Sequence, residues 1–272
     1  MMTFSIPSSV QSDLGHPAPP WTITVGDGPL IATAIHAGHD VARAAARVLQ
    51  VSEEVRLREE DPFTDIWTRI APRRVEVALS RFMVDLNRPR EKAVYIEPED
   101  AWDITVWREL PSQSLFDLSL SLYDLFYEQV HALIDDALTV HERVVVLDLH
   151  SYCHRRGGPD ALPADAEKNP DINVGTGSVD RERWGPEVER FVADLRAYRG
   201  PIGPLDVREN VKFRGGHFPT WINQTFGGRA CALAVEVKKV FMDEWTGVLD
   251  LDRHASVGEA LGLAAANLFE EG

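Results

Sequence analysis

The sequence predicts an α/β fold with a mostly parallel sheet, and three patterns support this expectation. Residues 143–151 (RVVVLDLHS) hold five apolar side chains interrupted only by Asp148, which is typical of a strand buried on both faces. Residues 230–237 (ACALAVEV) form a second such run. Apolar side chains recur at helical spacing from Asp117 to Leu138, directly before the first of these strands. A helix that leads back into a buried strand is the crossover that parallel sheets require.

The other elements follow from the spacing of apolar residues along the chain. Alternating or continuous apolar runs predict further strands at 21–25 and 30–35, separated by a turn, at 81–84, and at 211–218 with a glycine turn. Helical spacing predicts helices at 41–49, at 185–198 and from Ser256 onward, where Ser-Val-Gly-Glu forms a capping box. The polar segment between Tyr152 and Arg183 is expected to be a functional loop, because it directly follows a strand that ends in a histidine.

Length and composition favour one compact domain. The chain has 272 residues and contains no repeat, low-complexity tract or apolar run of membrane-spanning length. Residues 1–20 are rich in Pro, Ser and Gly, so we expect an irregular lead-in there. A single domain is then expected from residue 21 to residue 272.

Charge and cysteine content narrow the partners and the compartment. The net charge of −15 and a pI near 5.0 argue against a nucleic-acid or anionic-membrane partner, since both need a basic face. A small anionic substrate remains compatible if local arginines overcome the overall field. Two cysteines, Cys153 and Cys231, are too few for a disulfide framework, and residues 1–10 lack a secretory pattern. We therefore expect a cytoplasmic protein, of an oligomeric state that the sequence does not define.

Three strand ends carry side chains suited to catalysis. His36 follows the strand at 30–35, His150 ends the strand after Asp148, and Glu236 lies inside the last buried run. Burial raises the pKa of a glutamate, as a general base acting near neutral pH requires. Histidine ligands, an open position for water and such a base describe a hydrolytic zinc site. The alternative roles are a hydrogen-bonded core histidine and a glutamate that is ion-paired with a neighbouring cation.

Two polar stretches add further candidates. The acidic segment 58–65 (REEDPFTD) is either a solvated helix start or the source of an oxygen ligand. In the segment 81–90, three arginines surround Asn87, and arginine presents a fork of donors that matches a carboxylate. Ordinary surface ion pairs explain these arginines equally well.

Seven stretches, taken in order, resemble the N-formylglutamate amidohydrolases. They are HAG at 36–38, EEDPFTD at 59–65, SRFMVDLNR at 80–88, DLHS at 148–151, NVGT at 173–176, GGHF at 215–218 and VEVKKVFMDE at 235–244. This family is similar to the aspartoacylase and succinylglutamate desuccinylase group of zinc carboxypeptidase-like hydrolases. The resemblance implies a three-layer αβα fold of that type, with a mostly parallel mixed sheet flanked by helices.

The resemblance also implies an amidohydrolase that releases formate and L-glutamate from N-formyl-L-glutamate. Water on one divalent metal ion per chain, expected to be zinc, attacks the formyl carbon. The roles implied by motif are metal ligation by His36 and His150, general-base catalysis by Glu236, binding of the substrate carboxylate by Asn87 and Arg88, and polarisation of the amide oxygen or stabilisation of the oxyanion by Arg81.

The resemblance leaves several assignments open. Related deacylases carry His-x-x-Glu, whereas the residue three positions after His36 is another histidine. The second ligand is therefore His39, Glu60 or Asp61. A glutamate-based substrate has another carboxylate, and the candidates to hold it are Arg155, Arg156 and Arg214. Rival functions on the same scaffold are deacylation of another N-acyl amino acid, metallocarboxypeptidase action, and small-molecule binding without a metal.

Overall fold

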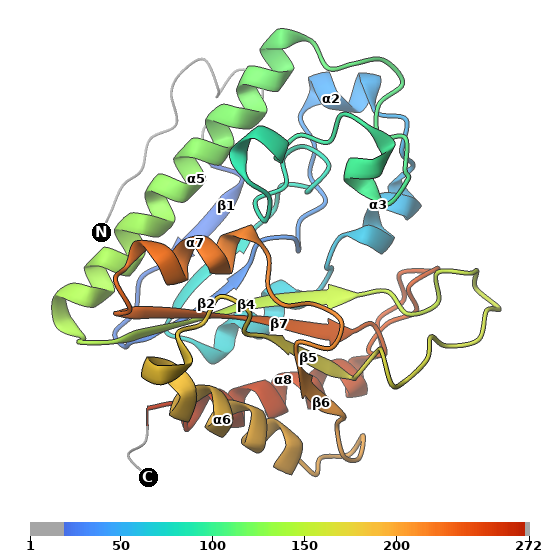
Figure 1. Ribbon diagram of the computed structural model, residues 1–272. Coiled ribbons are helices and arrows are strands. Elements are labelled where there is room, and N and C mark those ends of the chain that lie inside the picture. Colours follow the sequence, from blue (N-terminus) through green and yellow to red (C-terminus); the bar gives the residue numbers. More distant parts are fainter. Residues whose placement is uncertain (1–18, 270–272) are drawn as a thin grey trace.

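The computed structural model describes residues 19–269. Their strands form a seven-stranded mixed sheet (Figure 1). The strands are β1 (Trp21–Thr24), β2 (Leu30–Ala34), β3 (Arg73–Val77), β4 (Val144–Tyr152), β5 (Ile172–Gly175), β6 (Val207–Glu209) and β7 (Ala230–Lys238). Their order across the sheet is β1-β3-β2-β4-β7-β5-β6. Strands β3, β2, β4 and β7 are parallel neighbours, and β5 is parallel to β6. Only the β1–β3 and β5–β7 pairs are antiparallel, so the expected mostly parallel mixed sheet is confirmed.

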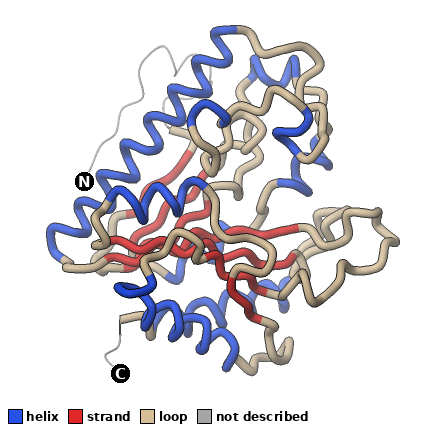
Figure 2. Tube along the Cα trace, viewed as in Figure 1, coloured by secondary structure: helices blue, strands red, loops and turns tan. Residues whose placement is uncertain are grey.

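Helices cover both faces of this sheet (Figures 1 and 2). Helices α5 (Gln113–Val140) and α7 (His217–Thr225) lie on one face, and α6 (Arg181–Ala197) and α8 (Leu251–Ala266) lie on the other. The shorter elements are α2 (Arg43–Val48), α3 (Glu53–Glu59), α4 (Thr64–Trp67), and the 3-10 turns η1 (Thr68–Ile70), η2 (Arg90–Lys92) and η3 (Pro98–Ala101). The predicted three-layer αβα architecture is confirmed.

The side chains of β4 explain why both faces are covered. Val144 and Val146 pack into the core under α5 and α7, whereas Val145, Leu147 and Leu149 pack into the core under α6 and α8. All nine residues of β4 are buried. A strand that is apolar on both faces is stable only between two covering layers, which is the usual position of a central parallel strand.

Two expected strands were placed wrongly. Residues 81–83 form a turn and no strand includes residues 81–84, because Phe82, Met83 and Val84 are buried in the core without a partner strand. No strand forms at 211–218: residues 210–216 are a loop after β6, and helix α7 begins at His217 after the Gly215–Gly216 pair. Strand β3 was not predicted, because three of its five residues, RRVEV, are charged and no continuous apolar run marks it. It inserts between β1 and β2, so these two strands are not neighbours.

The capping box expected at Ser256 was also wrong. Helix α8 begins at Leu251, and the side chain of Asp250 accepts a hydrogen bond from the N–H of Arg253. Ser256 is buried inside the helix. The local capping pattern failed because a stronger cap lies six residues earlier.

The described part of the chain also bears on two broader expectations. None of its helices combines the length and the apolar character that crossing a membrane requires. Most of the expected lead-in at 1–20 lies outside the described residues, so its irregular structure stays a prediction.

Replacing Asp250 with Ala is expected to lower the free energy of unfolding by about 1 kcal/mol, because the first turn of α8 loses its side-chain cap. Urea unfolding followed by circular dichroism measures this change. Asp252→Ala is the matched control, since it removes an exposed acid from the same turn without removing the cap. An equal loss in both variants would contradict the assigned helix start.

Candidate metal centre and substrate cavity

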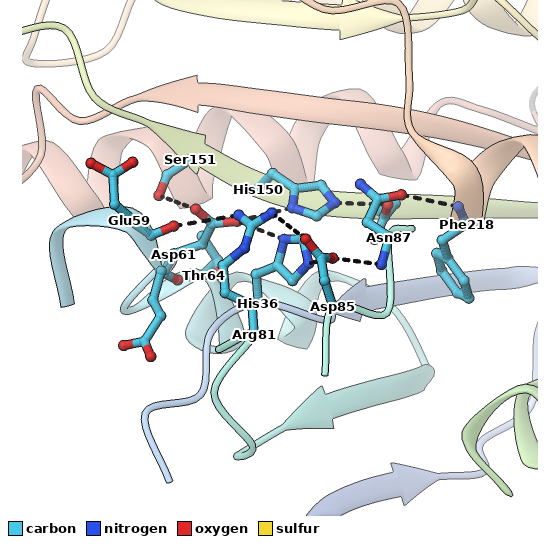
Figure 3. Close-up of polar contacts among 12 residues, drawn as sticks. His36, Glu59, Asp61, Thr64, Arg81, Asp85, Asn87, His150, Ser151 and Phe218 are labelled. Carbon is cyan, nitrogen blue, oxygen red and sulfur yellow. Dashed lines mark hydrogen bonds and ion pairs between the residues drawn. The ribbon is translucent and has the colours of Figure 1, made fainter. Parts of the chain in front are cut away.

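Two adjacent parallel strands bring the candidate metal ligands together (Figure 3). His36 follows β2, His150 lies near the end of β4, and their ring centroids are 4.9 Å apart. Asp61 comes from the loop after α3, and its backbone N–H donates to the carbonyl of His36 at 2.8 Å. One ligand atom from each of these buried side chains lies within 4.8 Å of the other two. Imidazole nitrogens and a carboxylate oxygen form a donor set that zinc binds.

Each imidazole is oriented by a second, buried carboxylate. Nε2 of His36 lies 2.7 Å from Asp85 Oδ1, and Nε2 of His150 lies 2.8 Å from Asp148 Oδ2. A carboxylate only accepts hydrogen bonds, so each Nε2 carries the hydrogen and each Nδ1 faces Asp61. The Nδ1 atoms of His150 and His36 are 2.9 and 3.6 Å from Asp61 Oδ2. Carboxylates placed behind histidines in this way fix the tautomer of metal ligands.

The three inner atoms require a shared cation. Two nitrogen lone pairs and a carboxylate oxygen repel one another unless a proton or a metal ion lies between them. Nδ1 of His36 is buried and has no hydrogen-bond partner among residues 19–269. Burial lowers the pKa of His150, but the negative charges of Asp148 and Glu236 outweigh burial and raise this pKa well above its ordinary value. The residues present therefore fit a divalent metal ion.

Glu236 lies beside this group on β7, where it is the register partner of His150. Its carboxylate lines the same cavity and forms no hydrogen bond or ion pair with another described residue. Burial raises the pKa of Glu236 to about 7, with Asp61 and Asp148 adding to the rise and His150 opposing it. An unpartnered carboxylate with such a pKa is suited to accept a proton near neutral pH.

The group formed by His36, Asp61 and His150 opens into a cavity of about 400 Å³, and many positively charged side chains line this cavity. The positively charged side chains that line it are Arg58, Arg81, Arg88, Arg156, Lys212, Arg214 and Lys239. In a chain with a net charge of −15, this arrangement concentrates positive potential in one place. The cavity is therefore suited to a small anionic ligand.

Asp85 joins the metal group to the first of these arginines. Its Oδ1 accepts from His36 and from the N–H of Asn87 (2.8 Å), and its Oδ2 accepts from Arg81 Nη2 (2.8 Å) and from the hydroxyl of Tyr95. Burial raises the pKa of Asp85, but the charges of Arg81 and His36 outweigh burial and hold it well below its usual range. Arg81 also donates to the Tyr95 oxygen (3.1 Å) and to a backbone carbonyl (3.3 Å). Two of its five N–H groups have no partner among the described residues and are available to a ligand.

Asn87 and Arg88 follow on the same loop. Asn87 Oδ1 accepts from the N–H of Phe218 at the start of α7 (2.9 Å), so its NH₂ group is left for a ligand. Arg88 donates to the carbonyl of Asp100 (2.9 Å), and its Nε is 3.8 Å from Asp85 Oδ2. Both side chains line the cavity, where an amide and a guanidinium together match a carboxylate.

Comparison with known proteins now identifies the family. The model of the N-formylglutamate amidohydrolase family matches residues 28–242. The chain belongs to this family. A comparison with curated protein sequences gave no match.

Two solved structures share the fold of this chain. The crystal structure of N-formylglutamate amidohydrolase from Ralstonia eutropha JMP134 matches with a TM-score of 0.72 and 17% identity, over 92% of this chain and 97% of that chain. Gene product Atu2144 from Agrobacterium tumefaciens matches with a TM-score of 0.65 and 17% identity, over 93% and 97% of the two chains. A metallo-carboxypeptidase from Burkholderia cenocepacia is a more distant match, with a TM-score of 0.39 and 16% identity, over 96% and 66% of the two chains.

The structure distinguishes His39, Glu60 and Asp61, the three candidates for the remaining metal ligand. Asp61 lies with the two histidines, whereas His39 and Glu60 lie outside both this group and the cavity wall. The reason is that His39 Nδ1 bonds Glu60 Oε2 at 2.5 Å, and Glu60 also accepts from Ser80 Oγ. The geometry therefore favours Asp61 as the remaining metal ligand. His39 instead holds Glu60, the residue directly before Asp61.

The three arginines considered for a second carboxylate differ in their surroundings. Arg155 lies outside the cavity, with Nη1 3.7 Å from Asp243 Oδ2. Arg156 lines the cavity, but both of its Nη atoms donate to the Glu59 carboxylate at 3.0 and 2.7 Å. Arg214 lines the cavity, and its side chain forms no hydrogen bond or ion pair with a described residue. Of the three, only Arg214 combines position with an unpaired charge.

Several residues of the site were not predicted from sequence. Asp85 was part of the Asp-Leu-Asn-Arg motif, but nothing local indicated that it bonds His36, 49 positions away. Tyr95 and Lys212 lie in segments without a motif. Buried Lys239 donates to the carbonyls of residues 58 and 60, both at 2.5 Å, and so supports the loop that carries Asp61.

Replacing Asp148 with Asn is expected to weaken zinc binding by about 10- to 100-fold, because the acceptor behind His150 loses its charge. Competition with a chromophoric chelator measures the dissociation constant. Asp124→Asn removes the charge of an exposed acid paired with Arg90 and serves as the matched control. An unchanged zinc affinity in the Asp148 variant would remove this residue from the metal centre.

Proposed function

We propose that this chain is a zinc-dependent amidohydrolase that converts N-formyl-L-glutamate and water to formate and L-glutamate. The observation that carries the proposal is the convergence of three metal-suited side chains with the unpartnered carboxylate of Glu236 in one cationic cavity. Membership of the N-formylglutamate amidohydrolase family supports the same reaction. A bound divalent ion would supply Lewis-acid polarisation of water and of the formyl oxygen.

The protein groups divide the remaining work of the hydrolysis. Glu236 takes a proton from water as the water oxygen bonds to the formyl carbon, and it returns that proton to the leaving nitrogen when the carbon–nitrogen bond breaks. Arg81 directs its free N–H groups at the oxygen on which negative charge develops. Asn87 and Arg88 hold the α-carboxylate of the substrate, which positions the formyl group over the metal centre.

The second carboxylate of the substrate is assigned to the loop that follows β6. Arg214 and Lys212 both line the cavity, and neither has a carboxylate partner among the described residues. Arg156 is less suited, because a substrate carboxylate would have to compete with Glu59. Arg155 is excluded by its position outside the cavity.

We also propose that the enzyme acts in the cytoplasm on a small anion, without a nucleic-acid or membrane partner. Both cysteines are free and buried, which suits a reducing compartment. The cationic side chains lie in the cavity, where they can attract a small anion. An acidic chain can therefore bind such a substrate without a basic outer surface.

The first experiment combines elemental analysis of the purified protein with formate release from N-formyl-L-glutamate, before and after chelation and zinc add-back. About one metal ion per chain with chelator-sensitive formate release is expected. Metal without formate release would redirect the search to other N-acyl amino acids or to C-terminal peptides. Absence of both would leave a small-molecule-binding protein on the same scaffold.

Replacing Glu236 with Gln is expected to lower formate release on the order of 100-fold or more, because the amide cannot accept the proton. Metal content should stay that of the wild type, since Glu236 lies outside the ligand group. Steady-state kinetics and elemental analysis of the same sample check both statements. Loss of the metal would make Glu236 a ligand and overturn its assignment as the base.

Replacing Arg214 with Ala is expected to raise KM for N-formyl-L-glutamate by about 10-fold or more, because a charge-assisted hydrogen bond is lost. The KM for N-formyl-L-glutamine, which lacks the second charge, should change little. Arg155→Ala is the matched control, because this neighbouring arginine lies outside the cavity. A larger effect from Arg155→Ala would reverse the assignment.

A further inference from the structure

The loop that carries Lys212 and Arg214 is shaped by a single buried side chain. Loop 210–216 connects β6 to α7, and its residues 211, 212 and 213 direct their N–H groups at Asn173 Oδ1, at 3.0, 2.9 and 3.4 Å. The amide nitrogen of Asn173 donates to the carbonyl of Phe213 at 2.8 Å. Asn173 itself is fully buried on β5, opposite Glu236 in the register with β7. One carboxamide therefore satisfies four backbone groups of this loop.

Close backbone contact continues along residues 175–177. Gly177 donates to the carbonyl of Arg214 at 2.7 Å, and a Cβ at residue 177 would lie 2.7 Å from that same oxygen. A Cβ on Gly175 would lie 2.6 Å from the backbone nitrogen of Gly215. Asn210, with a φ of 55°, bonds both the N–H and the hydroxyl of Thr176. Segment 173–177 thus fits loop 210–216 over most of its length, and this fit requires glycine at two positions.

The side chains of loop 210–216 have little other support. The Arg214 side chain forms no hydrogen bond or ion pair with the described residues, and Lys212 donates only to Asn169 Oδ1, at 2.7 Å. Phe213 packs edge-on against Tyr152, with ring centroids 5.5 Å apart. Long cationic side chains lose much rotamer freedom when they bind a ligand. The position of the backbone that carries them must therefore fix where their charged groups lie.

We propose that segment 173–177 determines substrate specificity by positioning loop 210–216, so that Lys212 and Arg214 hold the second carboxylate of an N-acyl dicarboxylic amino acid. Asn173 and Gly177 are positioning residues, because they contact the loop and not the cavity. This inference rests on the proposed function. It assigns a role to the Asn-Val-Gly-Thr-Gly sequence, which neither the metal centre nor the general base uses.

Replacing Gly177 with Ala tests the proposal without touching the catalytic groups. Gly177 is exposed and has no positive φ, so the added methyl acts by displacing Arg214 rather than by straining the chain. KM for N-formyl-L-glutamate is expected to rise about 10-fold, with kcat and zinc content near those of the wild type. KM for N-formyl-L-glutamine should change less than twofold, because its side chain carries no charge for the loop to bind.

Two further variants define the comparison. Gly185→Ala is the matched control, since a Cβ there meets nothing within 4 Å and its helix, α6, lies on the far face of the sheet. Asn173→Ala should reproduce the selective rise in KM by releasing the loop. Because Asn173 is buried and this variant is prone to misfolding, Gly177→Ala decides the question if Asn173→Ala does not fold.

The outcomes separate this inference from the proposed function. An equal rise in KM for both substrates, or a fall in kcat alone, would overturn the inference, because the loop would then shape the cavity in general. Calorimetric binding of L-glutamate and L-glutamine gives a readout independent of turnover. If the wild type released no formate, the proposed function would fail, and an unchanged glutamate affinity in Gly177→Ala would overturn the inference as well. A selective loss of glutamate affinity would support it.

Discussion

The parallel pairing of β2, β4 and β7 is the constraint on which the site depends. Parallel strands end at the same edge of the sheet, so His36, His150 and Glu236 arrive together although the chain separates them by 200 positions. The pairing also requires apolar residues on both faces of β4, and these residues create the two cores under the helices. The backbone hydrogen bonds that join β2, β4 and β7 therefore both stabilise the fold and bring the candidate site residues together.

The charges around the metal centre are arranged in compensating pairs. Buried Asp85 and Asp148 are tolerated because each faces an imidazole N–H, and Asp85 also meets Arg81. This leaves the Nδ1 atoms of His36 and His150 and the carboxylate of Asp61 without compensation among themselves, and a bound cation would offset the excess negative charge. Among the described residues, Glu236 is the carboxylate of the cavity that forms no hydrogen bond or ion pair, which suits the proton transfer proposed for it.

The sequence predicted the parts of the site that lie on regular elements. His36, His150 and Glu236 followed from buried strands whose apolar runs are unmistakable, and strand direction then placed them at one edge. The loops were less predictable, because hydrogen bonds between distant residues fix them. The sequence left His39, Glu60 and Asp61 open as the remaining ligand, and the contact between His39 and Glu60 then separated Asp61 from the other two. Strand β3 was missed for a similar reason, since pairing with β1 and β2 and not an apolar run defines it.

In the proposed reaction, substrate choice and chemistry are separated in space. The groups proposed to act on the scissile bond are fixed by the sheet and by buried acids, so changing them disturbs the core. Lys212 and Arg214 lie on an exposed loop, outside the two hydrophobic cores. That loop is attached to the sheet through Asn173 and two glycine contacts rather than through the apolar core. A chain built in this way can change the acyl amino acid that it accepts by altering one loop and the segment beneath it, while the metal centre remains intact.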